Sequence, residues 1–341
     1  MKLTGLLILL LTHQGYWIGG QQSSVTIRAA VQGGLPNAEL SWELMLDGVK
    51  LSEGAMHLTG NDRDVAINIT PPKPRTRVTL QWVYRLTATK DSKPLETGTV
   101  AINLFPPNMI DELADRTRSR SIVVWDRPSG LPAALDAAKI PFTQIDDASK
   151  LLALRPDVVL VGPEMLGDRL LEQSSLNSLA SAGVSVMIFR QTRPDRVMRY
   201  PLQQRQPPEQ LAWRPDHPLL AEFSAADLQS WIDPSRDLSV LQLPADEPAL
   251  EIGYYPPQVQ SRQAGPIDTV LMTQTIDRGR IVLCQIPLGD WATDPRSQLL
   301  LRNALDFLLT RPEPTPRPSD RPKAIAPKTA TTIPTIQIPP G

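Results

Sequence analysis

The chain is poor in the residues on which many metal and catalytic sites depend. Cys284 is the only cysteine among 341 residues, and there are three histidines. A single cysteine excludes an intramolecular disulfide and any zinc site built from several thiolates. The 35 basic and 36 acidic residues nearly cancel, and a formal net charge of −1 offers no bulk attraction to nucleic acid or to an anionic membrane surface. We therefore expect no metal, no cofactor and no nucleic-acid partner.

The sequence motifs of common catalytic sites are absent too. The chain has no Walker-type phosphate loop, no G-x-G-x-x-G after a predicted strand, no H-E-x-x-H and no G-x-S-x-G. His217 is the only histidine in the C-terminal half, so a histidine-dependent reaction there would have to use it. The sequence therefore indicates no recognisable catalytic constellation.

A hydrophobic run long enough to span a membrane is also missing. The apolar run Gly5–Leu11 has seven residues, whereas a spanning helix needs about 20. Lys2 precedes this run and the small residues Gly19 and Gly20 follow it, which is the pattern of an export signal. We predict a signal peptide over residues 1–21, cleaved between about residues 18 and 24, and a periplasmic or extracellular location. The alternative is an ordinary buried N-terminal element.

The N-terminal third of the sequence contains a region in which apolar and polar residues alternate. Five such segments lie between Ser24 and Phe105, separated by Gly, Pro and Asp turns, and Asp47-Gly48 is typical of a hairpin. This pattern predicts an antiparallel, immunoglobulin-like β-sandwich over residues 22–106, with Trp42 and Trp82 in its core. The alternating positions are Val25, Ile27, Ala29 and Val31; Leu40, Trp42, Leu44 and Leu46; Val65, Ile67 and Ile69; Val78, Leu80, Trp82, Tyr84 and Leu86; and Val100, Ile102 and Leu104.

The hydrophobic pattern changes after a linker over residues 107–120. Continuous apolar runs alternate with helical stretches, which predicts a mostly parallel, flavodoxin-like α/β domain over residues 121–310. The predicted strands are Ile122–Trp125, Val158–Val161 and Val184–Phe189, and the predicted helices are Leu131–Lys139, Ala148–Leu154 and Leu170–Ser181.

Three further segments complete the predicted organisation. The Pro-, Arg- and Gln-rich stretch Thr192–Gln263 is expected to wrap the sheet edge. A hairpin then joins Thr269–Thr275 to Arg280–Leu288, and a helix follows, with Asp294 as its N-cap. The proline-rich stretch Arg311–Gly341 is expected to be a disordered tail.

Several stretches of the chain resemble known families. In the predicted α/β domain these stretches are residues 155–163 (RPDVVLVGP), 182–191 (AGVSVMIFRQ), 217–220 (HPLL), 227–231 (DLQSW) and 279–285 (GRIVLCQ). On these stretches, residues 121–310 resemble the class I glutamine amidotransferase-like fold, in the degenerate form found as an accessory domain in some glycosidases. The predicted sandwich, which ends in Asn103-Leu104-Phe105-Pro106, resembles the immunoglobulin-like modules of family 2 glycoside hydrolases.

The resemblance implies a domain without the family's nucleophile. Active members place a cysteine in the turn after a central strand, and the matching turn here carries Phe189, Arg190 and Gln191. Cys284 lies instead within an apolar strand, where a buried and inert thiol is the usual state. A Cys284–His217 catalytic pair is therefore disfavoured, and we predict no catalytic residues.

Six residues are predicted to form a ligand site at the carboxyl ends of the parallel strands, where open α/β sheets bind ligands. Indole faces, one guanidinium and two carboxylates suit a polyol, by stacking and charge-assisted hydrogen bonds. In the competing interpretation, Arg190 pairs with Asp126 or Glu164 and the tryptophans close the domain. The six residues are Trp125, Asp126, Glu164, Arg190, Gln191 and Trp291.

Three functional hypotheses stay open. The first is a non-catalytic accessory protein of the cell envelope that binds a carbohydrate or a glycosidase partner. The second is a glycoside hydrolase-related enzyme that uses Asp126 and Glu164 as acid and base; however, a β/α barrel needs about 250 residues, more than the α/β domain provides. The third is an envelope scaffold for partner or homo-oligomer contacts.

Overall fold

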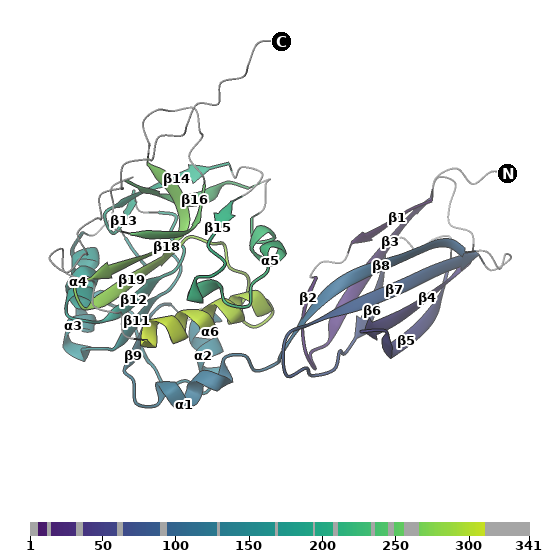
Figure 1. Ribbon diagram of the computed structural model, residues 1–341, viewed down its shortest axis with the longest axis horizontal. Coiled ribbons are helices and arrows are strands. Elements are labelled where there is room, and N and C mark those ends of the chain that lie inside the picture. Colours follow the sequence, from purple (N-terminus) through teal and green to yellow (C-terminus); the bar gives the residue numbers. More distant parts are fainter. Residues whose placement is uncertain are drawn as a thin grey trace, which may run out of the picture.

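The computed structural model describes a mixed multidomain protein that consists mostly of strands, with a few helices (Figure 1). The described residues are 6–11, 15–31, 37–59, 64–88, 94–127, 130–167, 170–193, 195–206, 211–232, 236–244, 249–255 and 266–310. The predicted tail, Arg311–Gly341, and residues 1–5 and 12–14 of the predicted signal lie outside them. No helix among the described residues is long and apolar enough to cross a membrane.

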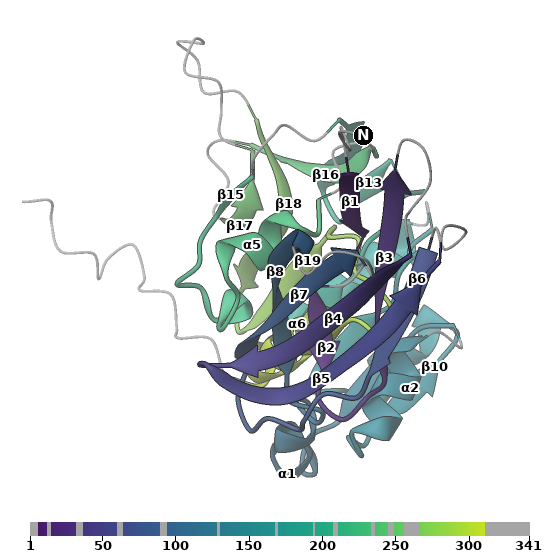
Figure 2. The same ribbon diagram turned by 90° about the vertical axis from the view of Figure 1, so that its right-hand side faces the viewer.

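The N-terminal part contains two sheets. One sheet has five strands in the order β2-β8-β7-β4-β5, and the other has three in the order β1-β3-β6. Figure 2 views the molecule from the end that these sheets occupy. The strands are β1 Leu6–Leu11, β2 Tyr16–Ile18, β3 Ser23–Val31, β4 Ala38–Leu46, β5 Val49–Leu58, β6 Asp64–Ile69, β7 Val78–Ala88 and β8 Pro94–Phe105.

The core of this part follows the alternation in the sequence. In β7, Leu80, Trp82 and Leu86 are fully buried and Tyr84 is buried with them, while Gln81 and Arg85 are exposed. Trp82 is therefore a core residue, as predicted, and Trp42 is half-buried against the same cluster. Strand β5 was missed by the sequence analysis: it lies at an open sheet edge, where most of its side chains stay exposed and apolar alternation is not required.

The C-terminal part is built on one large sheet. Five parallel strands run in the order β10-β9-β11-β12-β19, and antiparallel strands continue the sheet from β19 through β18, β16, β14 and β13. The parallel strands are β9 Ile122–Trp125, β10 Thr143–Ile145, β11 Val158–Val161, β12 Ser185–Ile188 and β19 Gly279–Cys284. The remaining strands are β13 Arg196–Val197, β14 Tyr200–Arg205, β15 Ala212–Trp213, β16 Leu238–Leu243, β17 Leu250–Tyr254 and β18 Ile267–Ile276.

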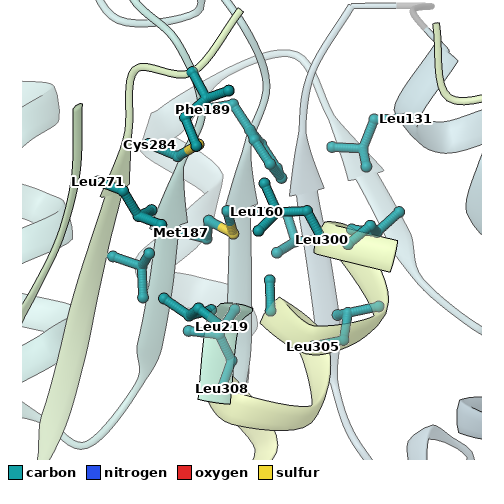
Figure 3. Packing of buried hydrophobic residues seen from close by; sticks show 14 of the residues in the cluster. Leu131, Leu160, Met187, Phe189, Leu219, Leu271, Cys284, Leu300, Leu305 and Leu308 are labelled. Atoms are coloured by element: carbon teal, nitrogen blue, oxygen red, sulfur yellow. The ribbon is translucent and has the colours of Figure 1, made fainter. Parts of the chain in front are cut away.

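Helices cover both faces of the parallel strands. Alternate residues of β11 separate two clusters: Leu160 faces α2 and α6, and Val159 faces α3 and α4. Figure 3 shows the first cluster, in which Leu300 and Leu305 of α6 approach Leu160. The helices are η1 Asp111–Leu113, α1 Ala114–Thr117, α2 Gly130–Ala137, η2 Ala148–Lys150, α3 Leu151–Leu154, α4 Leu170–Ser181, η3 Pro218–Leu220, α5 Ala225–Gln229 and α6 Pro295–Leu309.

One expectation for this part was wrong. The segment Thr192–Gln263 does not only wrap the sheet edge, because its described residues contribute β13 to β17 to the sheet. Strand β16, for example, pairs with β18 from Leu241 to Leu243. These strands have two to six residues, so that each is too short to show a clear apolar alternation in the sequence.

The two parts are joined by a polar and aromatic interface. Arg77, just before β7, donates to both carboxylate oxygens of Asp227 in α5, at 2.6 and 2.9 Å. The guanidinium of Arg77 also lies 4.8 Å from the centre of the Phe105 ring. Phe105, Met109 and Leu299 form a small buried cluster between the two parts. The N-terminal part therefore contacts α5 and α6 directly.

Candidate functional site

The structure brings five of the six predicted site residues to one edge of the sheet. Trp125, Val161 and Ile188 lie side by side at the ends of β9, β11 and β12, so the residues that follow share the carboxyl edge. Asp126 follows β9 directly, Glu164 follows β11, and Arg190-Gln191 follow β12. Trp291 reaches the same region from the segment after β19, where its ring centre lies 5.3 Å from that of Phe189.

Asp126 is packed into the sheet edge. Only 2% of it is exposed, and its carboxylate lies against the backbone of Gly162 at the end of β11. A Cβ atom at Gly162 would lie 2.2 Å from the Asp126 Cγ, so no other residue fits there without movement. The side chain of Gln144 donates to the Asp126 carbonyl oxygen at 3.0 Å. Asp126 therefore contacts the ends of both strands that flank β9, which are β10 and β11.

Glu164 connects two loops. Its amide donates to the carbonyl oxygen of Arg190 at 3.0 Å, and its carboxylate accepts from the amide of Thr192 at 3.0 Å. Glu164 has a φ of 59°, in the left-handed region that non-glycine residues rarely adopt. Both hydrogen bonds hold the loop after β11 against the loop after β12. In this structure one Glu164 carboxylate oxygen therefore has a structural role.

Gln191 is a fully buried connector. Its side-chain oxygen accepts from the amide of Leu166 at 2.9 Å, and its side-chain nitrogen donates to the carbonyl oxygens of Gly162 and Phe189 at 3.0 and 2.6 Å. Its own amide donates to the side-chain oxygen of Gln285 at 3.0 Å. Gln285, in the segment after β19, was missed by the sequence analysis, because a glutamine after an apolar strand carries no recognisable motif.

Arg190 does not pair with either predicted carboxylate. Among the described residues, no ion pair joins it to Asp126 or Glu164, and its buried Nε has no acceptor. The side-chain nitrogens of Trp125 and Gln285 are buried without an acceptor as well. Extension of the β12–β19 register places Arg190 opposite Gln285. These three donors lie at or just after the carboxyl ends of β9, β12 and β19, and a buried donor without an acceptor is unusual in a folded protein.

The tryptophans do not offer open faces for stacking. Trp125 and Trp291 are 3% and 6% exposed, and each belongs to one of the two hydrophobic clusters that cover the sheet. Trp231 is buried too, and Trp213 is half-buried against Gly253. The sugar stacking expected of Trp125 and Trp291 therefore finds no open indole face in this structure, because both rings are buried in the hydrophobic clusters.

Cys284 and His217 both have structural roles, one in the hydrophobic core and the other as a helix cap. Cys284 is the last residue of β19 and points into the cluster near Leu271 and Met187 (Figure 3). Burial raises the pKa of the Cys284 thiol to about 12, so it is protonated at neutral pH. His217 caps η3 by accepting from the amide of Leu219 at 3.2 Å, and burial lowers the pKa of its imidazole. These roles suit structure rather than nucleophilic catalysis.

A groove of about 470 Å³ lies beside Trp291, at the junction of the two parts. Small residues of α2 form one side, Ala133 and Ala137 among them, and the linker forms the other. Asp111 and Asp290 contribute two carboxylates, and none of the described residues that line the groove is basic. Its lining residues are Gln21, Pro107, Asn108, Met109, Ile110, Asp111, Gly130, Ala133, Ala134, Ala137, Ala138, Asp290, Trp291, Ala292 and Gln298.

Among the residues that line this groove, only Trp291 was predicted from the sequence as a site residue. The other residues come from four segments that are far apart in the chain, and alanines on the outer side of a helix carry no chemical signal. The groove volume lies within the range of about 300–1,000 Å³ that is typical of small-molecule sites. We therefore regard this groove, hereafter the junction groove, as the candidate binding site.

No protein-family model matches the chain, and no curated protein matches it. Similar solved structures include a CARDB domain from Pyrococcus furiosus in complex with di-metal ions, at 10% identity and a TM-score of 0.22 over 30% of this chain and 94% of that one. An FMN-binding β-glucuronidase from Facaelibacterium prausnitzii is 8% identical, with a TM-score of 0.21 over 54% of this chain and 27% of that one. A β-D-mannosidase from Dictyoglomus thermophilum is 9% identical, with a TM-score of 0.19 over 56% of this chain and 29% of that one.

The chain thus spans less than a third of each of the two glycosidase structures. At TM-scores near 0.2, these similarities carry no argument about function.

Proposed function

We propose that this chain is a non-catalytic, carbohydrate-associated binding protein of the cell envelope. The observation that carries the proposal is the junction groove, whose size suits a sugar and whose walls combine apolar and polar groups. Asn108 offers an amide group, Gln298, whose side-chain nitrogen donates to the Trp291 carbonyl oxygen at 2.8 Å, offers its amide oxygen, and the α2 alanines offer apolar surface for the C–H face of a sugar ring. A binding protein needs only such a surface, whereas an enzyme also needs a free acid, base or nucleophile.

The charge of the groove narrows the class of ligand. Asp111 and Asp290 are acidic, and the lining residues that the structure describes include no lysine, arginine or histidine. An anionic sugar such as a uronate would be repelled, because no cation compensates its charge. A neutral or amino-bearing oligosaccharide, whose hydroxyl or ammonium groups donate to carboxylates, fits the groove better.

We also infer that the two parts are an immunoglobulin-like sandwich and a degenerate amidotransferase-like domain. Numbered along the chain, the parallel strands lie in the order 2-1-3-4-5, which is the order of flavodoxin-like sheets. Helices α2 and α6 share one face, and α3 and α4 share the other, as that winding requires. The buried thiol of Cys284 supports the loss of a nucleophile from this domain.

Filling the junction groove tests the proposal. Ala133 is exposed on α2 and lines the groove, so Ala133→Phe adds a ring to it without disturbing the core. Ala153→Phe, on the exposed side of α3, adds the same ring elsewhere and is the matched control. The full chain is first applied to a glycan array, and the best-binding oligosaccharide is then titrated calorimetrically against the three proteins.

We expect Ala133→Phe to weaken binding at least tenfold and Ala153→Phe to leave it unchanged. Equal binding by both variants would place the ligand outside the groove. Absence of binding to any glycan would reject the carbohydrate proposal, and co-purification of an envelope partner would then favour a scaffold. Hydrolysis of a chromogenic glycoside, lost in Glu164→Gln, would instead establish the enzyme alternative with Asp126 and Glu164.

A further inference from the structure

The short strand β2 is an integral part of the sandwich. It pairs in parallel with the end of β8, where Tyr16, Trp17 and Ile18 lie opposite residues 103–105. Hydrogen bonds extend this pairing at both ends. The amide of Asn103 donates to the Gly15 carbonyl oxygen at 2.8 Å, and the amide of Gly19 donates to the Phe105 carbonyl oxygen at 2.9 Å. Trp17 and Ile18 are 3% and 2% exposed. Without β2, the edge of β8 and part of the core would be open to water.

Tyr16 also connects the sandwich to the α/β part. Its hydroxyl lies 2.8 Å from the hydroxyl of Ser230, which follows α5. The guanidinium of Arg296, near the start of α6, lies 4.3 Å from the centre of the Tyr16 ring and donates to the same Ser230 hydroxyl at 2.7 Å. One side chain of β2 thus contacts two helical segments of the other part.

The glycines that suggested a cleavage zone have a structural explanation. A Cβ atom at Gly19 would lie 2.5 Å from the Pro74 side chain and 2.8 Å from the Pro72 carbonyl oxygen. Gly20 has a φ of 74°, and its amide donates to the Pro71 carbonyl oxygen at 3.0 Å. Small residues are therefore needed here because the backbone packs against the 71–74 segment, whether or not a peptidase acts nearby.

We propose that Tyr16–Gly20 is retained in the functional protein, and that any N-terminal processing occurs before Tyr16. This revises the cleavage position expected from the sequence, between about residues 18 and 24, which would remove β2. It does not depend on a carbohydrate ligand, because it rests on the packing of β2. Gln21, the next residue, lines the junction groove, so the same cleavage would also alter that site.

The direct test is the N-terminus of the protein in cells. The full-length gene is expressed in a bacterium, and the protein from whole cells is characterised by N-terminal sequencing and intact mass. We expect the first residue of the folded protein to lie at or before Tyr16, including an uncleaved Met1. A soluble protein that begins anywhere between Trp17 and Ser24 would overturn the proposal.

A stability comparison gives an independent readout. Purified protein that begins at Gly15 is compared with protein that begins at Gln22, and we expect the shorter protein to melt at least 10 °C lower or without cooperativity. Two substitutions in the full chain distinguish the burial of Trp17 from the Tyr16–Ser230 hydrogen bond. Trp17→Ala should lower the melting temperature, and Tyr16→Phe should lower it less. Val49→Ala, at an exposed position of β5, is the control. Equal melting of the two N-terminal forms would also overturn the proposal.

Discussion

Substitution of Arg77 tests whether the two parts of the molecule stabilise each other. The Asp227 side chain is fully buried, and Arg77, itself mostly buried, donates two hydrogen bonds to it across the interface. Removal of one partner of a buried ion pair costs about 3–5 kcal/mol, because the remaining charge is left without compensation. Asp227 keeps hydrogen bonds from the amide and hydroxyl of Ser224, both at 2.7 Å. We therefore expect the effect of Arg77→Met to lie at the lower end of this range, a loss of about 3 kcal/mol in the free energy of unfolding.

The assay is equilibrium unfolding in urea, followed by circular dichroism and tryptophan fluorescence. At about 2–4 °C per kcal/mol for a domain of this size, the melting temperature should also fall by roughly 6–12 °C. Arg77→Lys keeps the charge but not the two-pronged geometry, so its loss should be smaller. Arg85→Met, at an exposed position of β7, is the matched control and should change stability by less than about 0.5 kcal/mol. An Arg77→Met protein as stable as the control would refute the reasoning.

Three further predictions concern the C-terminal part. Native Cys284 should resist alkylation at neutral pH, and Cys284→Ser should lower stability; rapid labelling would contradict its burial. Burial raises the pKa of this thiol from 9.0 to about 12, so the contribution of the protonated thiol to the free energy of unfolding is complete below pH 9 and is lost as the pH rises toward 12. The midpoint of urea unfolding, measured over this pH range, should therefore fall less in Cys284→Ser than in the unchanged protein. Gly162→Ala should lower the free energy of unfolding by more than about 2 kcal/mol, because the added Cβ would meet the Asp126 carboxylate. Gly167→Ala is the control and should change stability little, because its Cβ would lie 3.9 Å from the one neighbouring atom. Equal melting temperatures of the two variants would show that the Asp126 side chain moves aside at little cost.

Much of the architecture follows from hydrophobic pattern alone. The predicted strands Ile122–Trp125 and Val158–Val161 and the helix Leu170–Ser181 have the bounds that the structure gives, since fully buried parallel strands require uninterrupted apolar runs. Asp294 caps α6, as predicted, by accepting from the amide of Arg296 at 2.9 Å. Such features are local, and a local pattern specifies them.

Features that depend on tertiary contacts were harder to predict. Strand β2 belongs to a segment whose composition matches an export signal, and only its pairing with β8 reveals its role. Trp125 and Trp291 lie at strand ends and loops, as expected, but whether an indole is open or covered depends on loops that the sequence does not place. The junction groove is formed by four separate segments, and no single segment indicates it.

A crystal structure of the full chain with the best-binding oligosaccharide of the array tests whether a carbohydrate binds in the junction groove. We predict sugar density along Ala133 and Ala137 of α2, with hydroxyl or amino groups within hydrogen-bond distance of Asp111 or Asp290. Density instead at the sheet edge beside Arg190 and Gln285, or in the second hollow of about 530 Å³ beside Trp42 on the N-terminal sheet, would contradict this proposal.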